Sequence, residues 1–310
     1  MQFTALLLGF LQVAVPASKP VPRLQAVPLA HQEVSFQLDG REVARYHCEP
    51  GIERPFVFPV IGPAGRMLTR MGHPHDPLTH SHHNSVWIAH NDVNGVSFWA
   101  DGKTGRIVHQ RILELGDSDE SAWVAAENWW VAPDGKAVLR ERRRTAVEAL
   151  TGGEWLLAVD IQLEPAAGEV TFGKTPFGLI GVRMAKTIGV NDGGGVIRNS
   201  EGGVNEKEVL WNRARWVDYS GPVSSAAIDG ITLMDHPANP NHPTYYHVRN
   251  DGWMGTSLSY DAPRTIRPGE VLKLRYGLYV HAGRPAPEAI ERRWEAFAKS
   301  APPEMKYRTK

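Results

Sequence analysis

The sequence predicts an all-β fold, a large antiparallel β-sandwich with one helix near the C-terminus. Three observations support this. Apolar and polar residues begin to alternate at Val34, turn dipeptides such as Asp39-Gly40 separate short apolar runs, and only residues 287–299 show a convincing helical period. Side chains alternate between the two faces of a strand, so this pattern is typical of strands with one buried face. Many short strands separated by turns indicate a sandwich or a barrel.

The predicted strands follow one another along the chain. Val34, Phe36 and Leu38 alternate with polar residues, and Asp39-Gly40 then turns the chain into a partner strand at residues 42–46. Pro133-Asp134-Gly135 is a second turn between strands. Further strands are expected at residues 56–60, 86–89, 96–99, 106–113, 123–131, 136–148, 155–163, 170–172, 179–184, 196–199, 216–219, 228–234, 245–249, 256–260 and 271–281.

The predicted helix runs from about Pro287 to Lys299. Proline suits the first turn of a helix, and Ile290, Trp294 and Phe297 share one face at a spacing of four and three residues. We expect this helix to pack on the outside of a sheet. No linker is long or polar enough to divide the chain, so residues 31–310 are expected to form one domain.

The N-terminal segment resembles an export signal. An apolar run from Phe3 to Leu11 is shorter than the ~20 residues that span a bilayer, and small residues near Ala17 suit a signal peptidase. We therefore predict a signal peptide at residues 1–17, a proline-rich leader at 18–30, and a periplasmic or extracellular protein. No Lys or Arg precedes the run, which leaves a buried strand or a misassigned start as alternatives.

Composition excludes several classes of partner. Lys plus Arg equals Asp plus Glu, at 34 each, whereas nucleic acids and anionic membranes select for basic proteins. No later segment is predicted to cross a membrane. The single cysteine, Cys48, excludes an internal disulfide framework and is expected to be a small buried residue. The basic run at residues 140–144 is expected to be the solvated face of a strand.

Residues 73–92 form the densest polar cluster and hold six of the 13 histidines. Histidine titrates near neutral pH and is the commonest metal ligand, so the cluster predicts a functional site, although any single histidine has backbone hydrogen bonding as the simpler interpretation. A proline-containing loop at 72–81 is expected to lead into a strand. In that strand one face would carry His82, Asn84, Val86, Ile88, His90 and Asp92, and the other His83, Ser85 and Trp87.

A second candidate region is another proline-stiffened loop entering a strand, at residues 235–249, with His242, Tyr245 and His247. Glu201 and Asp218 are the carboxylates expected to partner a histidine. The chain has ten tryptophans. Most are expected to fill the core, but aromatic rings with polar neighbours also suit the apolar faces of sugars.

Distinctive motifs occur at residues 54–59, 80–87, 90–99, 105–109, 199–202, 216–222, 235–237 and 241–245. In these segments the chain resembles a PmoA-like family of exported bacterial proteins of unknown function, labelled methane oxygenase PmoA. The resemblance spans about residues 34–283. It implies an exported protein of bacteria that degrade polysaccharides. A weaker resemblance is to the β-supersandwich of galactose mutarotases and related lyases, and it implies histidine and carboxylate side chains on the concave face of a large sheet.

Three functions are compatible with these features. The first is an exported carbohydrate-active enzyme, an epimerase, lyase or hydrolase, that uses histidine and carboxylate acid–base chemistry on a sugar or sugar derivative. The second is a metal-dependent oxidase or hydrolase with His73, His75, His82 and His83 as ligands, although their spacing matches no standard metal signature. The third is a glycan-binding protein without catalysis.

The candidate residues divide by role. The sequence does not identify a cofactor: the protein either needs none or, as the alternative, binds a divalent metal. The predicted catalytic residues are His82, His90, Asp92, Glu201, Asp218 and His242, and the predicted substrate-binding residues are His75, His83, Asn94, Trp99, Trp211, Trp216, Tyr245 and His247.

Overall fold

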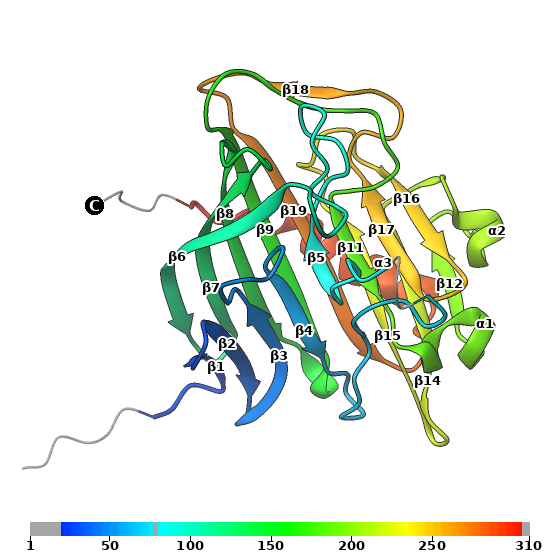
Figure 1. The fold of residues 1–310 in the computed structure, drawn as a ribbon. Helices are drawn as coiled ribbons and strands as arrows, with labels where there is room; N and C mark the ends of the chain where they lie inside the picture. The colour runs from blue at the N-terminus through cyan, green and yellow to red at the C-terminus, as the bar shows by residue number, and fades with distance from the viewer. Residues whose placement is uncertain (1–19, 77–79, 306–310) are drawn as a thin grey trace, which may run out of the picture.

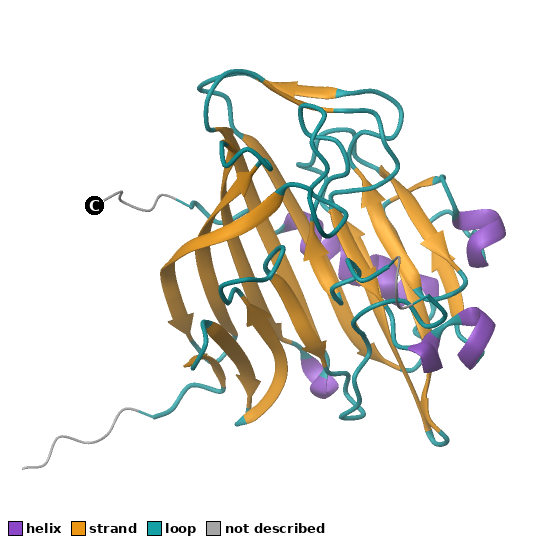
Figure 2. Cartoon of the chain, viewed as in Figure 1, coloured by secondary structure: helices purple, strands orange, loops and turns teal. Residues whose placement is uncertain are grey.

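Two large antiparallel sheets face each other and make up most of the molecule, with helices only at the periphery (Figures 1 and 2). This computed structural model describes residues 20–76 and 80–305. It confirms the predicted all-β sandwich. The predicted signal peptide lies outside the described residues, and export remains a prediction. No helix within the described ranges is long and apolar enough to cross a membrane.

The first sheet has nine strands in the order β1-β2-β3-β4-β5-β11-β17-β16-β13. Every pairing in it is antiparallel. Its strands are β1 (Leu24–Leu29), β2 (Glu33–Leu38), β3 (Arg41–His47), β4 (Phe56–Val60), β5 (Val86–Ile88), β11 (Ile180–Arg183), β13 (Arg213–Ala214), β16 (Thr244–Arg249) and β17 (Trp253–Ser257).

The second sheet has eight strands in the order β12-β14-β15-β19-β9-β8-β7-β6, and two short strands, β10 and β18, pair separately. The bounds are β6 (Arg106–Asp117), β7 (Ser121–Val131), β8 (Ala137–Ala149), β9 (Trp155–Pro165), β10 (Val170–Phe172), β12 (Val196–Asn199), β14 (Trp216–Ser224), β15 (Ala227–Asp235), β18 (Arg264–Ile266) and β19 (Leu272–Ala282).

One apolar core lies between the two sheets. It takes alternate residues from each strand, for example Val34 and Phe36 from β2, and Leu157 and Val159 from β9. Strand alternation leaves the intervening residues on the outer faces. The outer face of the eight-stranded sheet is covered in part by α3 (Pro287–Lys299), whose buried Ile290 and Phe297 pack with residues of β9, β14, β15 and β19.

The sequence located most elements to within a few residues, and the helix has the predicted bounds. The strands predicted at 56–60, 170–172 and 196–199 also have the predicted bounds. Residues 96–99 form no strand, only an isolated bridge from Val96 to Val93. Four short helical segments in the described residues were not predicted, and they lie outside the sheets or in turns: α1 (Val190–Gly193), α2 (Asn205–Val209) and the 3-10 turns Thr151–Gly153 and Lys186–Ile188.

The predicted proline-rich leader differs from the structure. Its second half forms β1, which pairs along its whole length with β2. Pro28 is tolerated there because β1 is an edge strand, and a missing N–H on its open side breaks no ladder hydrogen bond.

The basic run at residues 140–144 is only partly a solvated face, which corrects the prediction. Arg143 is buried between the sheets and forms an ion pair with the fully buried Glu141. Glu141 also accepts hydrogen bonds from Asn128 Nδ2 at 3.0 Å and Trp130 Nε1 at 2.7 Å. Strand alternation puts Glu141 and Arg143 on the inner face, where the charges pair with each other instead of with water.

Breaking this buried pair should destabilise the sandwich. We expect Arg143→Met to lower the free energy of unfolding by about 3–5 kcal/mol, because it leaves the Glu141 charge buried without its cation. Arg140→Met is the matched control, since Arg140 is exposed on the same strand and should change stability by no more than about 0.5 kcal/mol. Urea unfolding of both variants measures the difference, and equal effects would contradict a buried pair.

Candidate functional site

The site is organised by one row of residues that crosses the nine-stranded sheet. Register pairs His47 with Phe56, Phe56 with Trp87, and Trp87 with Gly181. Gly181 in turn pairs with Gly255, and Gly255 with His247. The neighbours of these residues along each strand, such as Val86, Ile180 and Met254, belong to the core between the sheets. The row therefore lies on the opposite, outer face, which faces the viewer in Figure 1.

Two glycines in this row make room for an indole. A Cβ on Gly181 would lie 2.5 Å from Cη2 of Trp253, and one on Gly255 would lie 2.7 Å from its Cζ2. Such separations are too short for real atoms, so glycine at both positions lets the Trp253 ring lie against the sheet. His83 then stacks on that ring, with centroids 5.4 Å apart and planes 15° from parallel. His83 also stacks on Trp87 at 5.4 Å.

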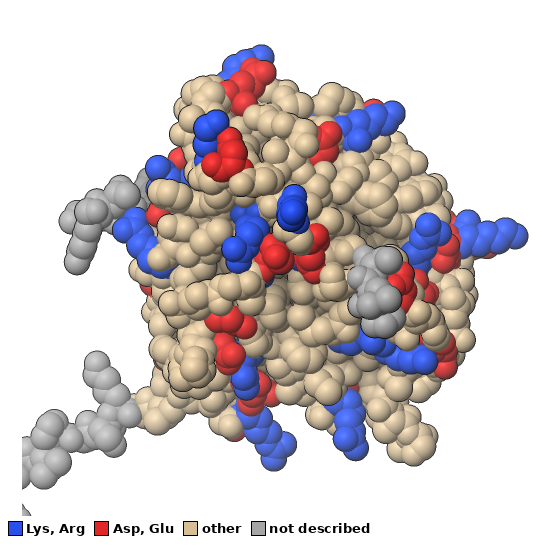
Figure 3. All heavy atoms as spheres, viewed as in Figure 1, with Lys and Arg blue, Asp and Glu red and all other residues tan. Residues whose placement is uncertain are grey.

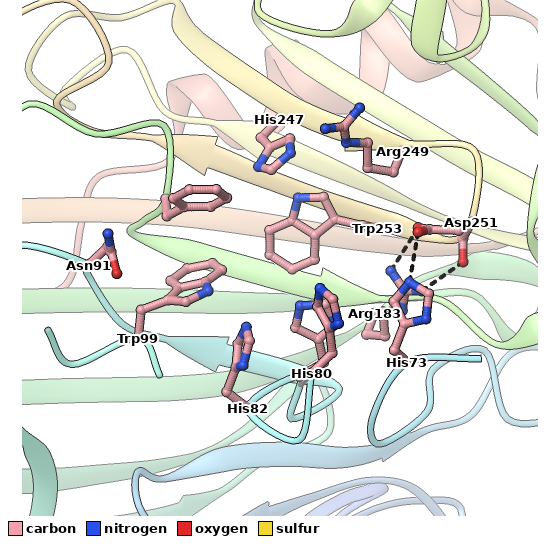
Figure 4. A pocket seen from close by; sticks show the side chains of 12 residues that line it. His73, His80, His82, Asn91, Trp99, Arg183, His247, Arg249, Asp251 and Trp253 are labelled. Carbon is pink, nitrogen blue, oxygen red and sulfur yellow. Dashed lines mark hydrogen bonds and ion pairs between the residues drawn. The ribbon is translucent and has the colours of Figure 1, made fainter. Parts of the chain in front are cut away.

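Loops close around this stack to form a pocket of about 370 Å³ (Figure 4). Its floor comes from β11, β16 and β17, and its walls come from the loops before and after β5 and from the loop before β11. The lining residues are His73, His80, His82, His83, Asn91, Trp99, Phe177, Arg183, His247, Arg249, Asp251 and Trp253.

Asp251 anchors one side of the pocket. Its Oδ1 accepts from Arg183 Nη1 at 2.8 Å, and its Oδ2 lies 2.9 Å from Nε2 of His73 (Figure 4). Burial alone would raise the pKa of Asp251, but Arg183 and His73 outweigh it and hold that pKa below its ordinary value. Nδ1 of His73 accepts the backbone N–H of His75, so the ring proton lies on Nε2 and is donated to Asp251. His73 thus joins its loop to the β16–β17 hairpin.

Three other histidines are held neutral by burial. Desolvation lowers the pKa of His82 to about 4, that of His83 to about 2 and that of His247 to about 3. Asp101 opposes the change at His82 but does not overcome it. Nδ1 of His83 and both ring nitrogens of His247 are buried and have no hydrogen-bond partner within the described residues. His83 and His247 therefore line the pocket as neutral imidazoles with covered nitrogens whose capacity to donate and accept hydrogen bonds is unused within the described residues.

The strand face predicted to carry the site is not the face that lines the pocket. In β5 and the residues after it, Trp87 and Asn91 lie toward the pocket, whereas Val86, Ile88 and His90 point away from it. His82 still reaches the pocket because Ser85 has a positive φ of 58°, which breaks strand alternation before β5. His82 and His90 therefore do not share a surface.

Four predicted residues near the histidine cluster lie outside the pocket. His90 is fully buried, where Nε2 lies 2.9 Å from the Ser259 hydroxyl and Nδ1 accepts the backbone N–H of Asp92. Asp92 Oδ1 accepts the backbone N–H of Gly95 in the following turn, and Asn94 Oδ1 accepts that of Thr171 in β10. His75 points to Asp192 at 2.9 Å, so of the four histidines predicted as metal ligands only His73, His82 and His83 line the pocket together.

The predicted carboxylate partners also lie elsewhere. Asp218 shares a strand face with Trp216, which lies under α3, and it is buried against His281 at 2.8 Å. Glu201 is exposed and pairs with Arg215. His242 bonds to Asp235 and stacks on Trp294 of α3. Asp218 lies in the eight-stranded sheet, and His242 contacts β15 of that sheet and α3 from a loop, so the structure does not bring these groups to the histidines of the pocket.

The later region contributes through its strand and not through its proline loop. His247 lines the pocket, and its ring contacts Trp211 at 4.3 Å. Trp211 stacks on Tyr260, which contacts Tyr245 at 4.4 Å. We call these four rings, His247, Trp211, Tyr260 and Tyr245, the aromatic ridge, and it continues outward from the pocket.

Sequence reasoning missed Arg183, Asp251 and Phe177, and it gave His80, Asn91, Arg249 and Trp253 no role. One signal was present. Arg183 interrupts the apolar run at residues 179–184, and a buried charge requires a partner nearby in space. That partner, Asp251, is 68 residues away, so only the sheet register identifies it.

The family model that matches residues 33–295 covers most of the described chain. The chain belongs to a family of unknown function (DUF6807). The description of this DUF6807 family contains neither the PmoA name nor an activity. A search of curated proteins finds no significant match.

Solved structures of other proteins align with this DUF6807 chain at low sequence identity. A heparan sulfate lyase, HepC from Pedobacter heparinus, aligns with a TM-score of 0.44 and 9% identity over 86% of this chain and 38% of the lyase. A mutant of that lyase aligns with a TM-score of 0.42 and 8% identity, over 87% of this chain and 38% of the mutant lyase. A GalM/aldose epimerase homologue from C. elegans aligns with a TM-score of 0.34 and 8% identity, over 84% of this chain and 99% of the homologue. The chain thus spans little more than a third of the lyase, and likenesses this distant say nothing about activity.

We expect Gly181→Ala to displace Trp253 and to lower the free energy of unfolding by about 1–3 kcal/mol, because the new Cβ overlaps the indole. The clash involves side chains only, so Trp253→Ala should remove most of that penalty. Urea unfolding of the two single variants and the double variant measures the coupling. Additive effects would contradict direct contact between position 181 and the indole.

Stability should fall on acidification. The folded-state pKa values of His83 and His247 lie below the ordinary value, so below about pH 6.5 the unfolded chain binds more protons and the folded state loses stability. Each of these buried rings should contribute a slope of up to about 1.4 kcal/mol per pH unit between pH 6 and 4. Urea unfolding over this range should show a smaller slope in His247→Gln. An unchanged slope would contradict a neutral, buried His247.

Proposed function

We propose that the pocket is the active site of an enzyme that performs acid–base chemistry on a sugar or sugar derivative, as an epimerase, lyase or hydrolase. The observation that carries this proposal is the convergence of buried neutral imidazoles between tryptophan rings. The pocket volume of about 370 Å³ lies in the range of small-molecule sites, at its lower end, which suits one or two sugar rings.

The unpaired imidazole nitrogens match the hydrogen bonding of a sugar. A neutral imidazole offers one donor and one acceptor, and a hydroxyl group both donates and accepts. His83 and His247 are only 7% and 6% exposed, so their free nitrogens are costly unless a ligand pairs with them. Trp99 and Trp253 supply flat apolar surfaces for the ring faces of a sugar. We assign substrate binding to these four side chains.

We assign proton transfer to His82. Its ring is half-buried and lies between Trp99 and His83, with centroids 6.0 and 4.6 Å away. A pKa of about 4 keeps the ring unprotonated at neutral pH, which is the form that a general base requires. His73 is a positioning residue, because both of its ring nitrogens are already engaged by Asp251 and the backbone of His75.

The Asp251–Arg183 pair holds this arrangement in place. Arg183 is fully buried and donates to both the carboxylate and the main-chain oxygen of Asp251. Because Asp251 bonds to His73, the pair fixes one end of the loop that carries His80, His82 and His83. Accurate placement of catalytic groups depends on such supporting contacts.

The aromatic ridge supports a substrate longer than the pocket. It runs from His247 through Trp211 and Tyr260 to Tyr245, and each contact is a ring pair no more than 5.2 Å between centroids. Over the face that carries the pocket, basic and acidic side chains are interspersed without one dominant sign (Figure 3). The proposed ligand is therefore recognised by stacking and hydroxyl hydrogen bonds more than by long-range charge.

Loss of the proposed base should abolish turnover. We expect His82→Gln to lower kcat by about 10²–10⁴-fold on a sugar that the wild type converts, because proton transfer is lost while the ring's neighbours remain. Glu201→Gln is the control, since Glu201 is exposed and outside the pocket, and should keep full activity. The assay screens neutral and acidic mono- and oligosaccharides for product by mass spectrometry and NMR.

Binding data decide between this proposal and a glycan-binding protein. Sugar binding without product across the whole panel would favour the binding protein. The same holds if the wild type is inactive and His82→Gln only lowers the affinity for the sugar. Full activity in His82→Gln would contradict the assigned role.

A further inference from the structure

A second cluster of ionisable side chains lies on the same outer face, at the far end of the row that leads to the pocket. Glu33 of β2 is the cross-strand partner of His47 of β3, and Glu49 follows His47 by two residues. Register and alternation thus bring two carboxylates and one imidazole to one place. One potential ligand atom from each residue lies within 4.8 Å of the other two.

The imidazole is oriented like a metal ligand. Nε2 of His47 lies 2.7 Å from the carbonyl oxygen of Phe58, an acceptor only, so Nε2 carries the proton. In the neutral ring the lone pair is then on Nδ1, which faces Glu49 Oε1 at 3.3 Å and Glu33 Oε1 at 3.6 Å. Stacking on Phe56, at 4.6 Å and 13° from parallel, holds the ring in that position. A ring N–H bonded to a backbone carbonyl is the usual support of a metal-ligating histidine.

The spacing and the surroundings also fit a cation. Zinc bonds its nitrogen and oxygen ligands at about 2.0–2.2 Å, which places neighbouring ligand atoms roughly 3.0–3.6 Å apart. Glu49 Oε2 is buried and has no hydrogen-bond partner within the described residues. Glu33 Oε2 is held by Arg45 Nη1 at 2.9 Å, which orients the carboxylate and leaves its other oxygen toward His47. Cys48 takes no part, because its Sγ donates to the Gln32 carbonyl.

We propose that Glu33, His47 and Glu49 form a binding site for a divalent transition-metal ion such as Zn²⁺. One nitrogen and two carboxylate oxygens are borderline and hard ligands, which suit Zn²⁺, Mn²⁺ or Co²⁺. The three side chains are 12–25% exposed, so water completes the coordination. The ion ties β2 to β3 beside the loop at residues 48–55, and the site is separate from the pocket that is proposed to be catalytic.

The test uses full-length, untagged protein freed of metal by a chelator. Calorimetric titration with ZnCl₂ should show one equivalent of bound Zn²⁺. Glu49→Gln and His47→Gln should each weaken the affinity for Zn²⁺ by about 100-fold or more. At about 100 times the dissociation constant, Zn²⁺ should raise Tm by about 5 °C in the wild type. Co²⁺ bound at the same site should give a visible absorption spectrum that both variants lose.

Two controls separate this site from the rest of the molecule. Glu53→Gln changes a carboxylate in the same loop but outside the cluster, and it should keep the Zn²⁺ equivalent. The double variant His82→Gln/His83→Gln removes two imidazoles from the pocket, and it should also still bind one equivalent of Zn²⁺. Glu49→Gln is isosteric, so it tests the site if His47→Gln fails to fold.

Three results would overturn the proposal. The first is a wild type that binds none of Zn²⁺, Mn²⁺ and Co²⁺, as expected if the cluster is only an ion pair around a doubly protonated His47. The second is equal Zn²⁺ affinity in the wild type and Glu49→Gln. The third is loss of Zn²⁺ binding in the pocket variant His82→Gln/His83→Gln, which would place the ion in the pocket.

Discussion

The register of the nine-stranded sheet is the constraint on which the site depends. It aligns His47, Phe56, Trp87, Gly181, Gly255 and His247 across six strands, all on the outer face. A slip of one residue in any strand would turn its members toward the core. The two glycines matter most, since only their missing side chains let Trp253 lie against the sheet and carry His83 above it. The imidazole cluster is therefore supported from below by backbone geometry.

This outer face departs from the usual pattern of a sandwich. An outer face is normally polar and solvated, but here Phe56, Trp87, Ala89, Trp99 and Trp253 form an apolar cluster separate from the core between the sheets. The loops that follow β4, β5 and β10 cover that cluster. Burial beneath them lowers the pKa values of the histidines, so the same loops shape the pocket and set the protonation of its side chains.

Buried charges are handled differently inside and outside the sandwich. Between the sheets, Glu141 and Arg143 satisfy each other within one strand, with Asn128 and Trp130 completing the hydrogen bonds. At the pocket, Arg183 depends on Asp251 from a different hairpin, and Asp251 in turn holds a loop through His73. The first arrangement is local and structural. The second couples three segments, so it positions groups that are far apart in the sequence.

Local sequence patterns were sufficient to predict the fold class, the C-terminal helix and most strands, because alternation and turn residues act over a few neighbouring positions. The sequence also indicated the histidine-rich segment, because an unusual density of one residue type is visible without a structure. His247 was among the candidates in the second region. Contacts between distant segments determine which face of β5 lines the pocket and why Asp251, not Glu201 or Asp218, supports His73. They also place Asp218 and His242 at the eight-stranded sheet, away from the pocket. Strand register, together with the positive φ at Ser85 that ends strand alternation before β5, controls these outcomes. They arise from pairing between residues distant in the chain, which local patterns do not encode.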